Sequence, residues 1–436
     1  MASPKRWASV MAAGLAVLVF GCGGPDPGSS VTGSPSSSLA TSSAPSPWDS
    51  RAALSYPDGT PTPVTHETGS RSFPSRDIAV SPGGLRLMDA CDRYAVLTSG
   101  ARSELRLVDL RSGTSRLVLA SPIARQHELA SWTRLKALMR PHASSDDFLI
   151  RIRHAEVSRR WLVWQEDLCI NSGGFTGLAS AAYAARIGSG LRIGRARRIA
   201  VTEWRPTSDT MIVEVGGLSF SLDGERVLVS TGRPDSQGIG HAVDLISLRS
   251  ARRVTLAESR SSDDTESALL GDQAVLLFAR DSDDSSCVFF DLGGDTLPVG
   301  SALNPPTTLY ASDSLSPCYL TVSEDGSIAW TITDDMPDGT ESAVFVASPG
   351  EGLRCMSAAG DGPVFSGRTL FWTVTDQQAD ALVAGADLDS LESFTVAGTD
   401  DIEAAMPGIV GSGGTLVVQL RTKVGAPCTL RVFDVD

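Results

Sequence analysis

The sequence lacks the motifs that identify the common enzyme classes. It contains no GxSxG nucleophile elbow, no HExxH zinc motif, no P-loop and no GxGxxG dinucleotide fingerprint. The five histidines, at positions 66, 127, 142, 154 and 241, are scattered, and no two have the spacing of a metal-binding pair. These absences favour a non-enzymatic role, and we assign no residue as catalytic.

Three further scarcities narrow the class of protein. No interior stretch approaches the roughly 18 uninterrupted apolar residues of a membrane helix. No CxxC pair is present, so neither a zinc ribbon nor a thioredoxin-like site is predicted. Lysine occurs only at positions 5, 136 and 423, so the basic charge comes almost entirely from arginine. The apolar content of 42% is nevertheless ample for a folded core.

The N-terminus has the pattern of a secretory signal peptide. Lys5 and Arg6 precede an apolar run that ends at Gly21-Cys22. The stretch VFGC resembles the lipobox of bacterial lipoproteins, which implies that residues 1–21 are removed and that Cys22 receives a lipid. Val19 and Phe20 stand where this family favours Leu and a small residue. An ordinary signal peptide with a chance cysteine is therefore the alternative.

Residues 22–72, which follow the signal peptide, are rich in Ser, Pro, Thr and Gly. Such a composition buries too little apolar surface to offset the entropy of ordering, so we predict a disordered tether. Together with a lipid on Cys22, this tether predicts a folded domain over residues 73–436 that is anchored at the extracytoplasmic face of the cell membrane.

The remainder of the chain contains a repeated hairpin pattern. Residues 217–231, GLSFSLDGERVLVST, have alternating apolar residues on both sides of Asp223-Gly224, a dipeptide that suits a tight hairpin turn. Seven segments match the second strand of this hairpin, and most lie roughly 40–55 residues apart, the spacing of four-stranded propeller blades. They begin at Asp92, Arg159, Glu225, Asp272, Gly326, Gly367 and Gly413.

The residues of this hairpin also carry a resemblance to a known family. Phe220-Ser221-Leu222-Asp223-Gly224 resembles the repeated hairpin of TolB-like and WD-repeat-like β-propellers, and VSEDG at 322–326 fits it more loosely. The resemblance implies an all-β fold, a single propeller of seven four-stranded blades, with six or eight blades as alternatives. Two β-sandwiches with the same strand spacing are the competing architecture.

Two segments depart from the regular repeat. Residues 124–140 have a helical pattern, with Leu129, Trp132 and Leu135 on one face together with Leu138 or Met139, so we expect a helical insertion. The last repeat, at 430–436, has no fourth strand after it. We therefore expect the strand-like run at 76–81 to close the last blade, as N-terminal strands do in β-propellers, because closure removes free sheet edges.

Acidic residues follow the second strand of several repeats, on the face where propellers commonly bind ligands. The candidates for a ligand or cation face are Asp281, Asp283, Asp284, Asp334, Asp335, Asp338 and Asp376, and Glu166 with Asp167 holds the same place in the second repeat. Residues 261–436 carry 28 acidic and 6 basic side chains. A cation or a basic partner would be attracted to such a region.

Calcium is the specific cation that this region suggests, because it binds carboxylate and carbonyl oxygens. TDDMPDG at 333–339 partly matches a calcium loop, which makes Asp334 and Asp338 weak candidates for ligands. Met336 replaces the third ligand of such a loop, so we assign no cofactor. The competing interpretation is that exposed acidic loops serve solubility in a chain of net charge −14.

The cysteines allow disulfides in an exported chain. Of the seven cysteines, six remain when Cys22 is set aside, an even number that permits three bridges. The expected strand positions favour two pairs, Cys287 with Cys318 and Cys91 with Cys428. Buried free thiols are the alternative.

These patterns favour an exported, lipid-anchored protein of the cell envelope whose propeller binds or scaffolds a protein or an envelope polymer. The alternative is an extracytoplasmic propeller hydrolase or lyase that acts on glycans or lactones through a carboxylate or calcium site. The basic segment 186–198 would suit a phosphate or an anionic polymer, but it also has the pattern of an outer hairpin. Nucleic acid is not expected as a partner of an exported chain with net charge −14.

Overall fold

The computed structural model describes residues 67–127, 129–139, 147–171, 175–202, 204–206, 213–215, 217–235, 238–259, 264–271, 273–279, 285–291, 307–312, 316–333, 342–348, 352–357, 360–375, 381–399, 402, 408–423 and 426–435. All of these residues belong to one compact unit, within Pro45–Asp436. No helix within them is long and apolar enough to cross a membrane.

The described strands form six four-stranded sheets, one five-stranded sheet and one two-stranded sheet. The first sheet contains β3 (Leu85–Ala90), β4 (Tyr94–Ser99), β5 (Leu105–Asp109) and β6 (Ser115–Leu119). The second contains β7 (Phe148–Val157), β8 (Trp161–Asn171), β9 (Phe175–Arg186) and β10 (Arg197–Val201). The third contains β13 (Leu218–Asp223), β14 (Arg226–Asp235), β15 (Gly238–Ser247) and β16 (Arg253–Ser259).

The remaining sheets follow in chain order. The fourth contains β17 (Asp264–Leu270), β18 (Gln273–Ala279), β19 (Ser285–Asp291) and β20 (Thr307–Ser312). The fifth contains β21 (Ser316–Val322), β22 (Ile328–Thr333), β23 (Ser342–Ser348) and β24 (Gly352–Ser357). The five-stranded sheet contains β25 (Gly360–Ser366), β26 (Thr369–Thr375), β27 (Ala381–Asp387), β28 (Ser393–Val396) and β1 (Glu67–Arg71). The last contains β29 (Ile409–Ser412), β30 (Thr415–Leu420), β31 (Cys428–Asp434) and β2 (Ser75–Val80).

The seven second strands predicted from the sequence all form, as β4, β8, β14, β18, β22, β26 and β30. Their richness in β-branched and aromatic residues suits a pleated strand, and β4 and β30 are buried along nearly their whole length. The hairpin of 217–231 is β13 and β14, and Asp223 pairs with Arg226 at its turn. Gly224 occupies the turn with a φ of +57°, a conformation that glycine adopts at low cost.

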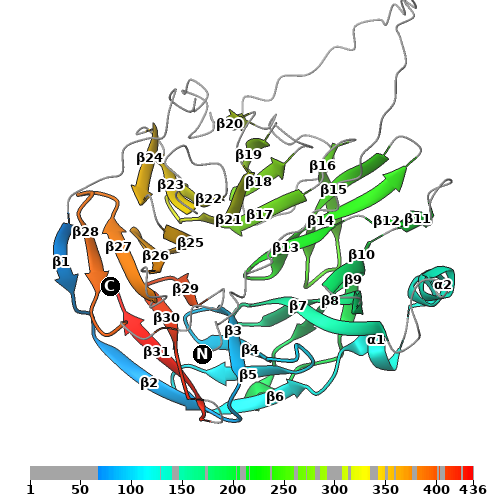
Figure 1. Cartoon of the computed structure of the whole chain (residues 1–436), viewed down its shortest axis with the longest axis horizontal. Coiled ribbons are helices and arrows are strands. Elements are labelled where there is room, and N and C mark those ends of the chain that lie inside the picture. Colours follow the sequence, from blue (N-terminus) through cyan, green and yellow to red (C-terminus); the bar gives the residue numbers. More distant parts are fainter. Residues whose placement is uncertain are drawn as a thin grey trace, which may run out of the picture. The chain divides into compact units, whose positions relative to one another are not determined.

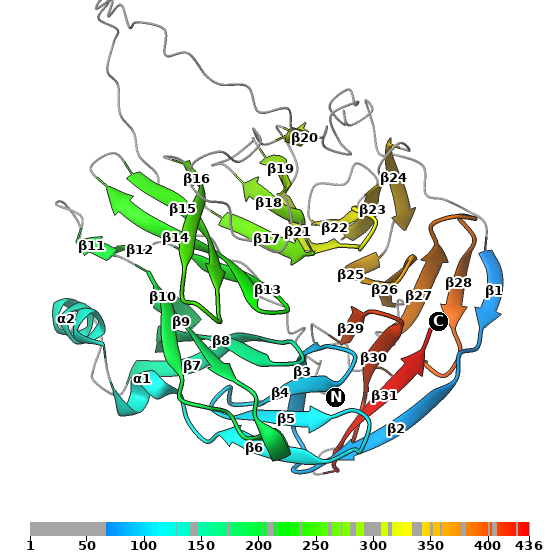
Figure 2. The same cartoon turned by 180° about the vertical axis from the view of Figure 1, so that it is seen from behind.

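The sheets close into a ring. The first strands of successive sheets, β3, β7, β13, β17, β21, β25 and β29, each contact the next, and β29 contacts β3. Both views show the sheets following one another in chain order around a common centre (Figures 1 and 2). The described unit is therefore a single all-β propeller rather than two sandwiches, and its sheets fall within the range of six to eight blades expected from the sequence.

The hydrophobic core is divided among the spaces between neighbouring sheets. One cluster joins the first and second sheets through Trp164, Tyr94 and Leu105, and another joins the second and third through Val163 and Phe220. A further cluster joins the last sheet to the first through Leu430 and related apolar residues. The first three sheets and the last two therefore pack on both faces, which explains why their strands are apolar along most of their length.

An N-terminal strand closes the ring, as the sequence predicts. β2 pairs antiparallel with β31, from Ser75 opposite Phe433 to Val80 opposite Cys428. The start of the folded region lies earlier than the predicted residue 73, because β1 at Glu67–Arg71 pairs in parallel with β28. The predicted tether of 22–72 therefore overlaps a strand at its end, and residues 1–66 lie outside the described part of the chain.

The predicted helical insertion forms between β6 and β7. It consists of α1 (Ile123–Gln126) and α2 (Ala130–Met139), at the rim of the second sheet (Figures 1 and 2). Trp132 and Leu135 are fully buried in the cluster between the first two sheets, and Leu129 and Met139 pack against it. Leu138, the alternative to Met139 on the predicted face, is instead 40% exposed.

Hydrogen bonds cross from one inner strand to the next. In each, a side-chain oxygen of one sheet accepts a hydrogen bond from a backbone N–H of the following sheet. Without this bond, the N–H at the strand edge would lack a partner. The pairs are Asp89 with Val157 (2.7 Å), Glu156 with Leu222 (2.5 Å), Ser221 with Leu269 (2.9 Å) and Glu266 with Leu320 (3.0 Å). Gln419 of the last sheet accepts the N–H of Leu87 in the first (2.6 Å). We call these contacts the inner-edge hydrogen bonds.

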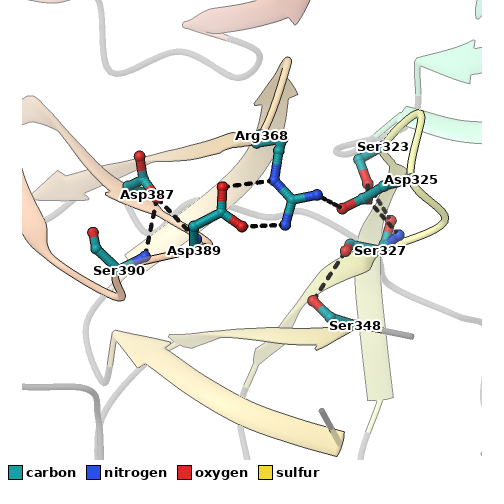
Figure 3. A network of polar contacts seen from close by, with 8 residues as sticks. All are labelled: Ser323, Asp325, Ser327, Ser348, Arg368, Asp387, Asp389 and Ser390. Carbon is teal, nitrogen blue, oxygen red and sulfur yellow. Dashed lines mark hydrogen bonds and ion pairs between the residues drawn. The ribbon is translucent and has the colours of Figure 1, made fainter. Parts of the chain in front are cut away.

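The turns between first and second strands lie on one side of the ring, which we call the turn face. Arginines at these turns bridge neighbouring sheets, as Arg159 does with Asp92 and Arg160 with Glu225. Arg368 donates to Asp325 of the fifth sheet (2.9 Å) and to Asp389 of its own sheet (Figure 3). Exposed pairs of this kind contribute little individually. Their recurrence gives the turn face a structural role.

Candidate functional site on the first two sheets

The predicted acidic face lies outside the described residues. This applies to Asp281, Asp283, Asp284, Asp334, Asp335, Asp338 and Asp376, and also to the proposed lipid attachment residue Cys22. Among the residues that the structure does describe, no group of three His, Cys, Asp or Glu side chains is arranged to hold a metal ion. The predicted ligand face therefore stays a prediction.

The cysteine predictions have different outcomes. Cys91 is a buried free thiol, so the predicted disulfide between Cys91 and Cys428 is not formed. The reason is geometric: Cys91 packs into the cluster between the first and second sheets, whereas Cys428 packs into the cluster between the last and the first. Cys287 lies in β19 and Cys318 in β21, but their side chains are outside the described part, and this pair stays a prediction.

Glu166 and Asp167, predicted to follow the second strand, are instead inside it and buried. β8 continues to Asn171 because it pairs over its whole length with the 12-residue β9. Glu166 accepts hydrogen bonds from the backbone N–H groups of Ile123 (2.7 Å) and Ala124 (2.8 Å) and from Trp164 Nε1 (2.9 Å). Glu166 therefore fastens the insertion to the second sheet. Burial raises its pKa, although these three donors oppose the rise.

The side of the ring opposite the turn face, the loop face, carries the start of β7 and the connection from β4 to β5. Four arginines gather here: Arg86 on β3, Arg102 in the β4–β5 connection, and Arg151 and Arg153 on β7. The N–H of Ile152 donates to the carbonyl oxygen of Arg102 (2.7 Å). This bond places Arg102 beside β7 at the residue between Arg151 and Arg153. We call the four residues the arginine cluster.

A β-bulge in β7 contributes to the cluster. The pairing of β7 with β8 shifts between Ile152 and His154, so Arg153 is the extra residue. Ile150 and Ile152 are buried before the bulge, and Ala155 and Val157 are buried after it. The alternation of buried and polar residues shifts by one position at the bulge. Arg151 and the extra residue Arg153 therefore lie on the polar side of the strand.

The charges of the cluster act on one another. Burial lowers the pKa of Arg102, and the nearby charges of Arg153, Arg86 and Arg151 lower it further, while Asp167 opposes them. Asp167 lies opposite Arg151 in the β7–β8 ladder, but it is 8% exposed and accepts from Gln165 Nε2 and Ser180 Oγ, both at 2.7 Å. Burial raises the pKa of Asp167 despite these bonds. Its carboxyl group is therefore already engaged by Gln165 and Ser180 within its own sheet.

A second group of polar residues lies further along the same strands. His154 Nε2 is 2.9 Å from Glu156 Oε1, and the His154 ring packs on Phe220 with centroids 5.1 Å apart. Burial lowers the pKa of His154, but the bond to Glu156 and the charges of Glu156 and Asp89 outweigh it and raise the pKa overall. Burial and the charge of Glu156 raise the pKa of Asp89 to about 8. Asp89 and Glu156 both already accept inner-edge hydrogen bonds.

This arrangement makes stability depend on pH through Asp89. Its folded pKa of about 8 exceeds the ordinary value of 3.8, so its contribution is fully present below about pH 3.8 and is lost as the pH rises through about 8. We expect the free energy of unfolding of the parent protein to fall, between pH 5 and pH 9, by about 1 kcal/mol or more relative to that of Asp89→Asn. Urea unfolding followed by tryptophan fluorescence at both pH values measures the difference.

Asp92→Asn is the matched control for this prediction. The hydrogen bond from Arg159 lowers the pKa of Asp92, so Asp92 stays ionised throughout pH 5–9 and its replacement should run parallel to the parent protein. A pH response of Asp89→Asn equal to that of the parent would show that Asp89 titrates normally.

The basic segment 186–198 forms an outer hairpin. β9 and β10 are antiparallel, and Arg197 stacks on Trp161 and donates to the carbonyl of Leu248 in the third sheet. Beside it, Arg93, Asp109 and residues 188–191 are among those that line a surface cavity of about 210 Å³. The arginines at 192, 195 and 198 are exposed and lie apart from the arginine cluster in the sequence.

Comparisons with known proteins agree with the propeller fold. No family model and no curated protein matches the chain. It is similar in structure to an oligogalacturonate lyase solved with manganese, at 9% identity and a TM-score of 0.50, over 87% of this chain and 98% of that one. The fold is that of a β-propeller. At such identity the likeness concerns the fold alone.

Two further solved structures are similar over shorter spans. The β-propeller domain of the Trilobed protease from Pyrococcus furiosus has 8% identity and a TM-score of 0.41, over 63% of this chain and 78% of that one. TolB from Acinetobacter baumannii has 15% identity and a TM-score of 0.31, over 71% and 77%. The lipobox at Cys22 is not tested by any of these propellers.

Sequence reasoning missed the arginine cluster. Its members are up to 67 positions apart, and only the packing of β3 against β7 brings them together. One local signal was available: in FLIRIRHAEV the buried positions change from 150 and 152 to 155 and 157, which indicates a bulge. Bulges are common next to binding sites, where they redirect a side chain. A break in the alternation of apolar residues therefore indicates a candidate site.

Proposed function

We propose that the protein is a lipid-anchored component of the cell envelope whose propeller binds a protein or an envelope polymer on its loop face. We count the five-stranded sheet as a blade, which gives the ring seven blades. The lipid on Cys22 and the tether would hold this domain at the extracytoplasmic side of the membrane, within reach of envelope partners.

The contrast between the two sides of the ring carries this proposal. The turn face is occupied by inter-sheet ion pairs such as Arg159 with Asp92 and Arg368 with Asp325. The loop face carries the arginine cluster and the insertion, which Glu166 fixes in place. Rigidly positioned loops on a stable scaffold are the usual location of binding residues.

A photo-crosslinking experiment tests this proposal on the intact, membrane-bound protein. Leu138 on α2 is 40% exposed and Leu117 on β6 is 38% exposed, so the two positions are matched in accessibility but differ in location. We expect a benzophenone side chain at Leu138 to crosslink an envelope component and the same group at Leu117 to give no adduct. Adducts are detected by mass spectrometry. Equal labelling at both positions, or none at either, contradicts a loop-face partner.

A propeller hydrolase or lyase acting on glycans or lactones is the second candidate, and the His154–Glu156 pair beside Asp89 supports it. A histidine bonded to a carboxylate is a common arrangement for general acid–base chemistry. Binding ranks first because both carboxylates accept inner-edge hydrogen bonds. Turnover of a lactone or glycan that is lost in His154→Asn but retained in the exposed-site control His127→Asn would place the enzyme first.

A further inference from the structure

We propose that a cavity on the turn face binds the ring of a neutral sugar through two neighbouring hydroxyl groups. The cavity has a volume of about 210 Å³ and lies between the β5–β6 turn of the first sheet and the turn that follows β9 in the second. It is lined by Arg93, Tyr94, Asp109, Ser112, Thr114 and residues 188–191. This inference goes beyond the proposed function, because the cavity lies on the side of the ring opposite the loop face.

The walls of the cavity are fixed by contacts within the protein. Asp109 Oδ1 accepts hydrogen bonds from the N–H groups two and three residues further along the chain (3.0 and 3.2 Å), which hold the turn of the first sheet. Across the cavity, Arg116 Nη1 donates to the carbonyl of Gly190 (3.1 Å), and Leu191 is buried in the cluster between the two sheets. The cavity is therefore preformed, as ligand sites usually are.

The same turn recurs in the sixth sheet, where Asp387 takes the place of Asp109 and Arg368 takes that of Arg93. Asp387 Oδ1 accepts from the N–H groups two and three residues further along (2.8 and 3.1 Å), as Asp109 does. The carbonyl of Arg368 accepts the N–H of the residue after Asp387, and that of Arg93 accepts the N–H of the residue after Asp109. The two turns can therefore be compared group by group.

The two arginines differ in their partners. Two carboxylates hold the guanidinium of Arg368, at 2.9 and 3.0 Å (Figure 3). The guanidinium of Arg93 lies 3.7 Å from Asp109 Oδ2, which is too far for a hydrogen bond, and it donates to no other described residue. Its charge also acts on Asp92, but Arg159 already bonds to both oxygens of that carboxylate. Arg93 and Asp109 Oδ2 therefore keep hydrogen-bonding capacity at the cavity.

These groups match the hydroxyls of a sugar. Arg93 offers donors beside the acceptor Asp109 Oδ2, so one sugar hydroxyl can accept from the first while its neighbour donates to the second. Ser112 Oγ donates to Thr114 Oγ1 (3.0 Å), which leaves the hydroxyl hydrogen of Thr114 available. The lining residues carry one positive and one negative charge, which suits a neutral ligand. The volume is below the about 300–1,000 Å³ of sites for drug-sized ligands, so it fits one ring.

Binding of defined sugars to the full-length protein tests this inference, in a detergent whose head group is not a sugar. The probes are the methyl glycosides of glucose, galactose, mannose and N-acetylglucosamine, followed by saturation-transfer NMR and titration calorimetry. Tetrahydropyran-2-methanol is the matched control, because it has the ring without neighbouring ring hydroxyls. We expect at least one glycoside to bind and the control not to bind. No binding of any glycoside, or equal binding of the control, overturns the inference.

Variants locate the site. Asp109→Asn keeps Oδ1, which holds the turn, and replaces the acceptor Oδ2 with a donor, so it should weaken binding at least about tenfold, the effect of losing a hydrogen bond to a charged group. Arg93→Gln should weaken it similarly, and because the Arg93 side chain is 49% exposed, this change should leave the fold intact. Asp387→Asn makes the same change in the matching turn and should alter binding less than about twofold.

The outcomes are separate from those of the proposed function. Thermal melting of each variant confirms that it is folded, and Arg93→Gln decides the question if Asp109→Asn melts early. Unchanged binding in the folded variants of Arg93 and Asp109, or equal weakening by Asp387→Asn, overturns the cavity as the sugar site. The crosslink at Leu138 reports on the loop face, so either result can fail while the other stands.

Discussion

Gly411→Ala should destabilise the propeller more than any other single-methyl change considered for this chain. A Cβ at Gly411 would lie 2.2 Å from the carbonyl oxygen of Phe365 and 2.8 Å from its carbonyl carbon. These are backbone atoms of β25, the inner strand of the adjacent sheet, so no side-chain rotation relieves the clash. We expect a loss of about 3 kcal/mol or more in the free energy of unfolding, the upper range for overpacking.

Gly217→Ala is the control for this prediction. No heavy atom lies within 4 Å of a Cβ built at Gly217, and its φ does not require glycine. Its effect should stay within about 0.5 kcal/mol, because alanine fits without strain. Urea unfolding by tryptophan fluorescence compares the two variants. A Gly411→Ala protein with the urea midpoint of the parent would show that β25 and β29 can move apart.

Gln419→Leu should also destabilise the protein strongly, by about 3 kcal/mol. Gln419 is 5% exposed, and it accepts from Leu87 N–H (2.6 Å) and donates to the carbonyl of Leu85 (2.9 Å). Leucine fills a similar volume but leaves a buried N–H and a buried carbonyl without partners, and each such loss costs about 1–3 kcal/mol. Both lost bonds join the last sheet to the first, so the junction at which the ring closes is weakened directly.

Gln126→Leu makes the same chemical change at an exposed residue, whose side chain donates to Ser121 Oγ (3.0 Å). Its effect on the free energy of unfolding should be within about 0.5 kcal/mol. If Gln419→Leu is equally mild, its two hydrogen bonds add little to ring closure, and the pairing of β2 with β31 together with the apolar cluster between the last and first sheets is sufficient.

Much of the fold can be predicted from patterns of residues that are close together in the sequence. The second strands form where apolar residues alternate, Asp223-Gly224 turns as its dipeptide predicts, and the run at 76–81 supplies the closing strand β2. The helix at Ala130–Met139 forms where Trp132 and Leu135 recur at helical spacing. In each case the residues that specify the element lie next to one another in the chain.

The sequence-based predictions fail where contacts between residues that are distant in the sequence determine the structure. ETGSR at 67–71 has no apolar alternation, and it becomes β1 only because β28 offers an edge to pair with. Glu166 was expected in an exposed position, but the length of β9 extends β8 past it and the N–H groups of the insertion draw its carboxylate inward. The arginine cluster depends on the packing of β3 against β7, which no local window contains.

The inner-edge hydrogen bonds all run in the same direction around the ring. In each described pair the acceptor side chain belongs to the earlier sheet and the N–H to the next one, from Asp89 with Val157 through Glu266 with Leu320. A chain made from its N-terminus therefore completes each acceptor before the strand that will donate to it is synthesised. Each of the first four sheets therefore offers an acceptor to the sheet that is synthesised after it. The first sheet is different, because the N–H of Leu87 meets its acceptor, Gln419, only when the chain is nearly complete.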